Sequence, residues 1–166
     1  LAIVGMPNVG KSSLMNGLLQ EKKSIVTPIA GTTRDSIDSF LRYCKKDIRL
    51  IDTAGLRKKS KITGDVEFYS TVRTFRVIQD CDIALVLIDA GKGFNNQDKD
   101  ILRHVIDLGK GLIIVVNKWD LLEKDTHTLK EFRQNIIDQY PVLGYYPILF
   151  ISVSHNLRTR EVLKRT

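Results

Sequence analysis

The residues from Gly5 to Ser12 have the types and the spacing needed to hold a phosphate group. They read Gly-Met-Pro-Asn-Val-Gly-Lys-Ser, follow an apolar run over residues 1–4 and precede a helical pattern. A backbone that wraps around a phosphate in this way points several N–H groups inward, and the positive end of the following helix faces the anion. We expect the Lys11 ammonium to reach the β- and γ-phosphates of a nucleotide and the Ser12 hydroxyl to bind Mg²⁺. The other nucleotide contacts predicted in this loop are Asn8, Val9, Gly10 and Ser13.

A second motif indicates which base the nucleotide carries. The apolar run over residues 113–116 ends in Asn117-Lys118-Trp119-Asp120. The Asp120 carboxylate can accept hydrogen bonds from both the N1–H and the N2 amino group of guanine, which adenine does not offer in that arrangement. A wrong base leaves this buried charge unpaired, so discrimination on the order of 10⁴ is within reach. We expect Lys118 to lie along the base and ribose, and Asn117 to connect this loop to the phosphate loop.

A third group of residues has the form of a γ-phosphate sensor. An Asp-x-x-Gly sequence over residues 52–55 follows a strand-like run, and a Gly-Thr-Thr turn ending at Thr33 lies between it and the phosphate loop. We expect Asp52 to hold Mg²⁺ through water, the Gly55 N–H to contact the γ-phosphate, and the Thr33 hydroxyl to bind Mg²⁺ when a triphosphate is present. Either segment alone is ordinary turn chemistry. In this order and spacing, the motifs predict a nucleotide-dependent switch.

Alternating strand-like and helix-like patterns predict an α/β fold with a mostly parallel sheet. We expect six strands, one of them an antiparallel edge strand, with helices on both faces. The expected strands cover residues 1–4, 39–44, 47–51, 83–88, 112–116 and 148–151, with Lys45 and Lys46 at the tip of a hairpin. The helix positions expected in the core are Leu14, Met15, Leu18, Leu19, Val72, Phe75, Ile78, Ile101, Leu102, Val105, Ile106, Leu129, Phe132, Ile136 and Tyr140.

Length and composition agree with one domain over residues 1–166. With 43% hydrophobic residues, a chain of 166 residues can bury a core without disulfides. Its two cysteines, Cys44 and Cys81, lack the spacing of metal ligands and suit a reducing cytoplasm. No apolar run approaches the length of a membrane span, and no oligomer is predicted. Because the first residue already lies in a predicted strand, we expect a segment of a longer multidomain protein.

Together these motifs resemble those of the bacterial translation-factor-related GTPases, and among them the Der or EngA family of ribosome-assembly proteins with two GTPase domains. The similarity covers nearly the whole chain and is greatest to the second GTPase domain. It rests on the phosphate loop and on residues 29–38, 50–59, 61–64 and 66–70. Two positions depart from the family pattern. A Ser-Ala pair that contacts the base reads Ser152-Val153 here, so the Val153 N–H takes that role, and Asn156 replaces a common glycine, for which we expect a left-handed backbone.

The resemblance implies a P-loop GTPase fold with GTP and GDP as ligands, and hydrolysis assisted by Mg²⁺ at Ser12, Thr33 and Asp52. The implied catalytic residues are Asn8, Lys11, Thr33 and Gly55. Leu56 stands where many GTPases have a glutamine that orients the attacking water, and its side chain forms no hydrogen bond. In this family the asparagine at the position of Asn8 is associated with K⁺, which stabilises charge between the β- and γ-phosphates. We therefore expect slow, potassium-stimulated hydrolysis; the alternative is that Asn8 only shapes the loop.

An excess of positive charge indicates an RNA partner. The formal charge is +7, from 26 basic and 19 acidic residues, and four cations fall within residues 57–61, directly after the γ-phosphate sensor. Such a run is often only a solvated loop, but a loop ordered by the nucleotide could couple GTP state to binding of RNA phosphates. Given the resemblance, the predicted partner is RNA of the large ribosomal subunit, reached through this loop and flanking domains.

Other functions stay open on the sequence alone. The domain could be a guanine-nucleotide-binding regulatory module with negligible hydrolysis of its own, as Leu56 suggests. It could also belong to the related GTPases of tRNA modification or small-subunit assembly. A kinase that uses the same phosphate loop fits the sequence less well, because no site for a phosphate acceptor is recognisable and most kinases use adenine nucleotides. The three histidines, His104, His127 and His155, lie outside the motifs and are expected to be ordinary surface or capping residues.

Overall fold

The computed structural model describes residues 1–20, 38–51, 66–123 and 125–166. The predicted γ-phosphate sensor with Asp52 and Gly55, the hydroxyl of Thr33, Leu56 and the basic run over residues 57–61 therefore lie outside the described residues. The predictions for these positions stay predictions. The phosphate loop, the guanine motif and the loop around Ser152 lie within them.

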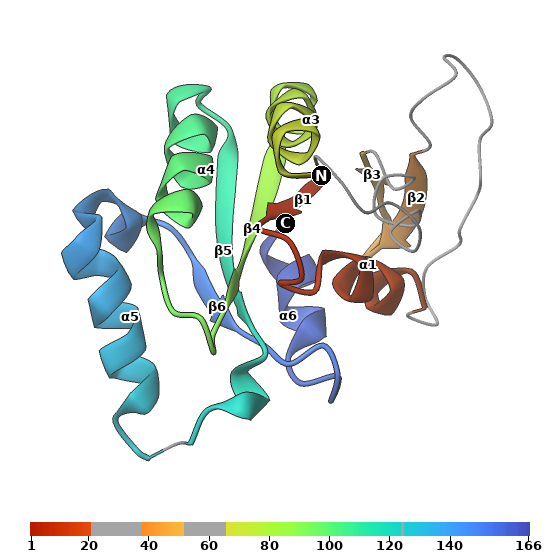
Figure 1. The fold of residues 1–166 in the computed structure, drawn as a ribbon. Helices are drawn as coiled ribbons and strands as arrows, with labels where there is room; N and C mark the ends of the chain where they lie inside the picture. Colours follow the sequence, from red (N-terminus) through yellow and green to blue (C-terminus); the bar gives the residue numbers. More distant parts are fainter. Residues whose placement is uncertain (21–37, 52–65, 124) are drawn as a thin grey trace.

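Four parallel strands form the centre of the domain, in the order β1-β4-β5-β6 (Figure 1). They are β1 (Ala2–Gly5), β4 (Ile83–Asp89), β5 (Gly111–Asn117) and β6 (Ile148–Phe150). Nearly every residue of β1, β4 and β5 is buried, as expected for parallel strands covered on both faces. In the register of β4 and β5, Asp89 lies opposite Asn117. The carboxyl ends of the strands therefore bring polar residues to one edge of the sheet.

An antiparallel hairpin of β2 (Ser39–Tyr43) and β3 (Lys46–Leu50) lies beside β1. Leu1 connects the two sheets, because its amino group donates to the Arg49 carbonyl at 2.7 Å and its carbonyl accepts from the Ile51 N–H at 3.0 Å. This alternation of bonds is that of parallel neighbours. All six predicted strands are thus present, and the predicted α/β fold class is confirmed. They form a four-stranded parallel sheet and a two-stranded antiparallel hairpin joined through Leu1, rather than one six-stranded sheet.

The tip of the hairpin differs by one residue from the prediction. Cys44 and Lys45 form the turn, with φ of 49° and 66°, whereas Lys46 pairs with Tyr43 as the first residue of β3. A two-residue turn with positive φ at both positions matches the right-handed twist of the strands it joins. Neither residue is the asparagine or glycine typical of such turns, so no local signal in the sequence marks this turn.

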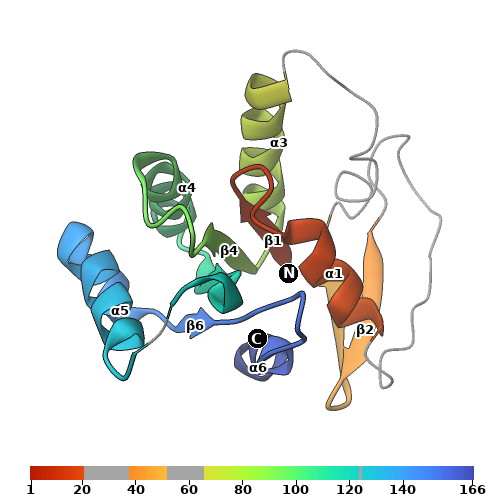
Figure 2. The same ribbon diagram turned by 60° about the horizontal axis from the view of Figure 1, so that its bottom comes forward.

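Helices cover both faces of the parallel sheet, as Figure 2 shows. One face carries α3 (Val66–Asp80), α4 (Asn96–Asp107) and α5 (Thr128–Gln139), and the other carries α1 (Lys11–Gln20) and α6 (Thr159–Arg165). Two apolar cores result, and β4 supplies both: Ala84, Val86 and Ile88 face one core, whereas Leu85 and Leu87 face the other. Two short 3-10 helices, η1 (Trp119–Leu121) and η2 (Pro141–Tyr145), complete the described elements.

Most of the predicted core positions on the helices are confirmed, with two exceptions. Leu14, Met15 and Leu18 of α1 are fully buried, but Val72 of α3 and Leu129 of α5 are 42% and 38% exposed. The stripes on α3 and α5 are therefore narrower than expected and are made by residues one turn further along, such as Phe75 and Phe132. In the described part of the chain, none of the helices is both long and apolar enough to cross a bilayer.

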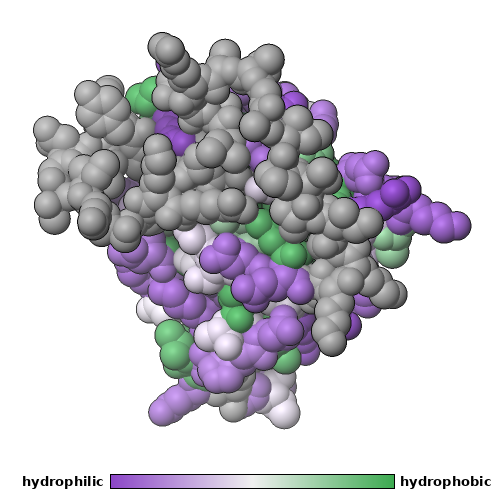
Figure 3. All heavy atoms as spheres, turned by 90° about the vertical axis from the view of Figure 1, so that its right-hand side faces the viewer, coloured by the Kyte–Doolittle hydropathy of each residue, from purple (hydrophilic) through white to green (hydrophobic). Residues whose placement is uncertain are grey.

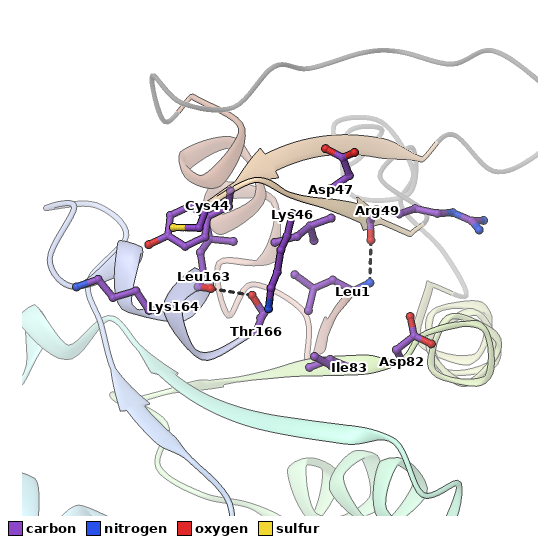
Figure 4. Close-up of a pocket in the computed structure, with 12 residues that line it drawn as sticks. Leu1, Cys44, Lys46, Asp47, Arg49, Asp82, Ile83, Leu163, Lys164 and Thr166 are labelled. Atoms are coloured by element: carbon purple, nitrogen blue, oxygen red, sulfur yellow. Dashed lines mark hydrogen bonds between the residues drawn. The ribbon is translucent and has the colours of Figure 1, made fainter.

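A cleft of about 490 Å³ lies between the hairpin and the end of α6 (Figure 4). Leu1 and Thr166, the two ends of the chain, both line it, together with Cys44 from the turn. The face of the molecule on the side of α1 and the hairpin is shown in Figure 3. The described residues visible there are mainly hydrophilic, with only small, separate apolar areas.

Candidate nucleotide-binding site

The phosphate loop connects β1 to α1 through three residues with positive φ. The values are 137° at Gly5, 65° at Asn8 and 101° at Gly10. A side chain at Gly5 would clash with the Leu87 carbonyl, and one at Gly10 would clash with the Asn117 amide. Both glycines are therefore required by close approach as well as by backbone angle. The result is a tight loop that ends at the N-terminus of α1, where the Leu14 N–H donates to the Gly10 carbonyl at 2.8 Å.

Lys11 is held inside this loop. Its ammonium donates to the carbonyls of Gly5 and Met6 at 2.7 and 2.6 Å, and the residue is only 9% exposed. A buried cation is costly unless its hydrogen bonds are satisfied, and here the loop carbonyls satisfy it. The first turn of α1 carries no acidic residue, so the positive charge of Lys11 and of the helix end is not opposed from within the helix. This end of the loop is suited to an anion.

Asn117 joins the phosphate loop to the loop that follows β6. From the end of β5, its Nδ2 donates to the Val9 carbonyl at 2.8 Å, and its Oδ1 accepts from the Val153 N–H at 3.2 Å. The side chain is 3% exposed. The predicted connection between Asn117 and the phosphate loop is therefore present. The contact to Val153 was not predicted, and it fixes the loop after β6 to the same amide.

Lys118 has an ionic partner that the sequence patterns did not indicate. The backbone of Lys118 is left-handed, with φ of 61°, and its ammonium lies 2.6 Å from Asp89 Oδ2. Asp89 is 6% exposed, and its other oxygen accepts from the Gly91 N–H at 3.0 Å. The position of Asp89 at the carboxyl end of a parallel strand is the signal that could have identified it as a site residue, since ligands bind at that edge of such sheets. Asp89 holds the Lys118 side chain at one wall of the site.

Asp120 lies in η1, opposite the loop that follows β6. Its Oδ2 is 3.4 Å from Nδ1 of His155, a histidine that had no predicted role. Ser152 is fully buried, and Asn156 has φ of 51°, so the predicted left-handed backbone at that position is confirmed. The Ser152 N–H and carbonyl both bond to Leu157, at 3.1 and 2.8 Å. These bonds close the loop of residues 152–157, and His155 of this loop lies next to Asp120.

Between these groups lies a cleft of about 480 Å³. Six of the predicted nucleotide-binding residues line it, namely Gly10, Ser13, Asn117, Lys118, Asp120 and Val153. The lining residues that were not predicted are Asn16, Gly17, Gln20, Leu121 and Ser154. Leu121 is 68% exposed, so an apolar surface beside Asp120 is available to a flat ring. The cleft has the size of an ordinary small-molecule site, with an anion-binding loop at one end and a carboxylate at the other.

Comparison with known proteins agrees with this arrangement. Residues 1–118 match the family model described as 50S ribosome-binding GTPase. The chain belongs to this GTPase family. The matched residues contain the phosphate loop, Asn117 and Lys118, whereas Asp120 and the loop around Ser152 follow them. The predicted resemblance is thereby confirmed at the level of the family.

Curated relatives extend the similarity over nearly the whole GTPase chain. It is 48% identical over 165 residues to GTPase Der of Amoebophilus asiaticus, an alignment that covers 99% of this chain and 38% of that protein. It is 53% identical over 152 residues to GTPase Der of Chlorobium phaeobacteroides, covering 92% of this chain and 35% of that one. The chain therefore spans less than two fifths of the length of these relatives.

Solved structures of the GTPase Era have the same fold. A point variant of Aquifex aeolicus Era, bound to GDP and AlF₄⁻, superposes with a TM-score of 0.72 at 32% identity, covering 98% of this chain and 54% of that one. Era in complex with MgGDPNP and a segment of 16S ribosomal RNA gives a TM-score of 0.72 at 29% identity, covering 98% of this chain and 53% of that one. The P-loop GTPase fold predicted from the motifs is confirmed.

Proposed function

We propose that this domain binds GTP and GDP in the cleft between the phosphate loop and Asp120, and that it hydrolyses GTP as a molecular switch. The observation that carries the proposal is the pair of hydrogen bonds of Asn117 to Val9 and Val153. These bonds support the proposal because they join the phosphate loop to the loop after β6, and residues of both loops line one cleft. We further propose that residues 1–166 form one domain of a longer protein, because the chain covers only 38% and 35% of the length of the two GTPase Der relatives.

The base is selected by Asp120 and the loop after β6. The Asp120 carboxylate accepts from the guanine N1–H and N2 amino group. The Val153 N–H, which donates to Asn117 Oδ1 in this structure, would exchange that partner for the base, and Ser152 would support the base from the same loop. Lys118, fixed by Asp89, covers one face of the ring with its aliphatic part. Exclusion of adenine then follows from the unpaired carboxylate that adenine would leave.

The phosphates take the place of the loop carbonyls as partners of Lys11. The residues that would hold Mg²⁺ are Ser12, Thr33 and Asp52, and the ion would neutralise charge on the β- and γ-phosphates. Ser12 is well placed, because it lies in the first turn of α1 directly after Lys11. Val9, Gly10 and Ser13 complete the phosphate and ribose contacts.

Hydrolysis is proposed to be slow and stimulated by potassium. Leu56 offers no hydrogen bond to a water nucleophile, so catalysis rests on electrostatic stabilisation of the phosphates by Lys11, by the Gly55 N–H and by K⁺ at Asn8. The positive φ of Asn8 puts its side chain on a sharp turn of the loop. The second candidate function, a nucleotide-binding module with negligible hydrolysis, is favoured by Leu56 alone.

Two measurements on the domain test these proposals. A fluorescent GDP analogue should be displaced by GDP and not by ADP; equal displacement would contradict the guanine site. Single-turnover hydrolysis should be faster in potassium than in sodium at equal ionic strength, and Asn8→Ala should remove that difference while GDP binding stays nearly unchanged. No hydrolysis in either salt would favour the second candidate function.

The proposed partner is the large ribosomal subunit, in the cytoplasm. Support comes from the description of the family, from relatives named GTPase Der and from the excess of basic residues. The basic run over residues 57–61 and flanking domains would make the contact with ribosomal RNA. Cosedimentation of the full-length protein with ribosomal subunits should differ between GTP and GDP, and identical profiles would contradict a switch.

A further inference from the structure

His155 lies where it can control the geometry of the guanine-binding carboxylate. Its Nδ1 is surrounded by three oxygen atoms, at 3.2 Å from Ser154 Oγ, 3.3 Å from Ser152 Oγ and 3.4 Å from Asp120 Oδ2. The His155 N–H also donates to Ser152 Oγ at 3.3 Å. One imidazole nitrogen therefore connects the loop after β6 to η1, two segments that are separate in the sequence.

We propose that His155 is a positioning residue for guanine recognition, which holds the Asp120 carboxylate in the orientation that accepts the base. This inference rests on the proposed assignment of Asp120 to guanine. It adds a specificity-determining contact that lies outside the sequence motifs.

The ring supports Asp120 from outside the cleft. Asp120 and Ser154 line the nucleotide cleft, but His155 does not, and its side chain is 70% exposed whereas that of Asp120 is 18% exposed. A base entering the cleft therefore meets the carboxylate without displacing the imidazole. His155 can therefore support Asp120 without competing with the base for the carboxylate.

Restraint of one oxygen matters because guanine needs both. A carboxylate offers two oxygens with about four lone-pair directions, and acceptance from N1–H and the N2 amino group requires its plane to align with the base. In the tautomer that carries its proton on Nδ1, the ring can donate to Oδ2. The group is then oriented before the base arrives, which lowers the cost of ordering it on binding.

The contacts of the His155 ring also restrain the loop after β6. The two serines that face the ring flank Val153, whose N–H is held by Asn117. His155 thus restrains Asp120 on one side of the proposed base site, and Asn117 restrains Val153 on the other. Loss of the ring should affect recognition of the base and leave the phosphate loop as it is.

The test compares GDP affinity in His155→Ala, His155→Asn and a control, His127→Ala. His127 is exposed and makes no side-chain cap to α5. We expect His155→Ala to weaken GDP binding by about two- to fivefold, the range of a solvent-exposed charged contact. The amide of Asn can donate from nearly the position of Nδ1, so His155→Asn should restore most of the affinity. His127→Ala should bind GDP like the parent.

A second pair of variants shows whether the effect passes through the carboxylate. In an Asp120→Asn background, measured with xanthosine diphosphate, adding His155→Ala should change affinity by less than about twofold, because the charged acceptor is gone. An equal loss in both backgrounds would mean that His155 acts on the loop generally and would overturn the proposal. Unchanged or tighter GDP binding in His155→Ala would overturn it as well. A parent protein that does not prefer GDP to ADP would instead refute the proposed guanine site itself.

Discussion

At the scale of single residues, base selection in the proposed site depends on Asp120. Asp120→Asn replaces an acceptor pair by one acceptor and one donor, which suits the oxygen that xanthine carries in place of the N2 amino group. We expect the variant to bind xanthosine diphosphate more tightly than GDP, as measured by competition against a fluorescent nucleotide. A variant that keeps the affinity of the parent for GDP and ignores the xanthine nucleotide would show that Asp120 does not contact the base.

Lys11 gives a second prediction at this scale. Lys11→Ala should weaken both GTP and GDP by about tenfold or more, because charge-assisted hydrogen bonds in a buried site are each worth about 1.5–3 kcal/mol. Lys110→Ala is a matched control, since the Lys110 ammonium also donates to a backbone carbonyl, that of Gln79 at 2.8 Å, but lies on the exposed surface. Calorimetric titration of both variants should separate them. Equal affinities would remove Lys11 from the phosphate site.

At the scale of elements, α4 begins with a capping box that contains a buried acid. Asn95 Oδ1 accepts from the Asp98 N–H at 3.1 Å, and Asp98 Oδ2 accepts from the Asn95 N–H at 3.2 Å. Burial of the carboxyl raises the pKa of Asp98 from 3.8 to about 6, with the Asn95 N–H opposing the shift and the charge of Asp89 adding to it. The folded chain therefore binds a proton in a range where the unfolded chain does not. Its free energy of unfolding falls as the pH rises through this range.

Asp98→Asn tests this linkage. The amide keeps an acceptor for the Asn95 N–H but does not titrate, so the variant should lose the contribution of Asp98, which amounts to about 2–3 kcal/mol between about pH 4 and pH 7. Urea unfolding at pH 5 and pH 7 should show a smaller drop in stability for Asp98→Asn than for the parent. Asp100→Asn, at an exposed position of the same helix, should behave like the parent. A parallel pH dependence in all three proteins would contradict a raised pKa at Asp98.

Strands and helices were predictable because their signals are local. Apolar runs identified all six strands to within about two residues, and helical spacing identified Leu14, Met15 and Leu18 as core. The hairpin tip was misplaced by one residue, because positive φ at Cys44 and Lys45 is set by the strands on either side. The contacts of Asp89 and His155 join segments far apart in the chain, and no local spacing encodes such a contact.

At the scale of the whole molecule, the two cysteines have opposite surroundings, because Cys81 lies in one apolar core and Cys44 lies on the surface. Cys81 is 1% exposed beneath the end of α3, and its thiol donates to the Ile78 carbonyl at 3.3 Å. Burial raises the pKa of the Cys81 thiol, whereas Cys44 is exposed at the hairpin turn. A native protein should therefore release about one equivalent of chromophore with a thiol-exchange reagent, and two after denaturation. Rapid reaction of both thiols in the native protein would contradict the packing of this core.

The hydrogen bonds of the Asn117 side chain determine when the site forms during folding. It joins positions 108 residues apart on one side and 36 residues apart on the other. Contacts of such long sequence separation close large loops and form late in folding. Because β5 and the segment after β6 follow the phosphate loop in the chain, the loop is synthesised before the residues that clamp it. We therefore expect this domain to hold a nucleotide only after both segments have been made and have packed.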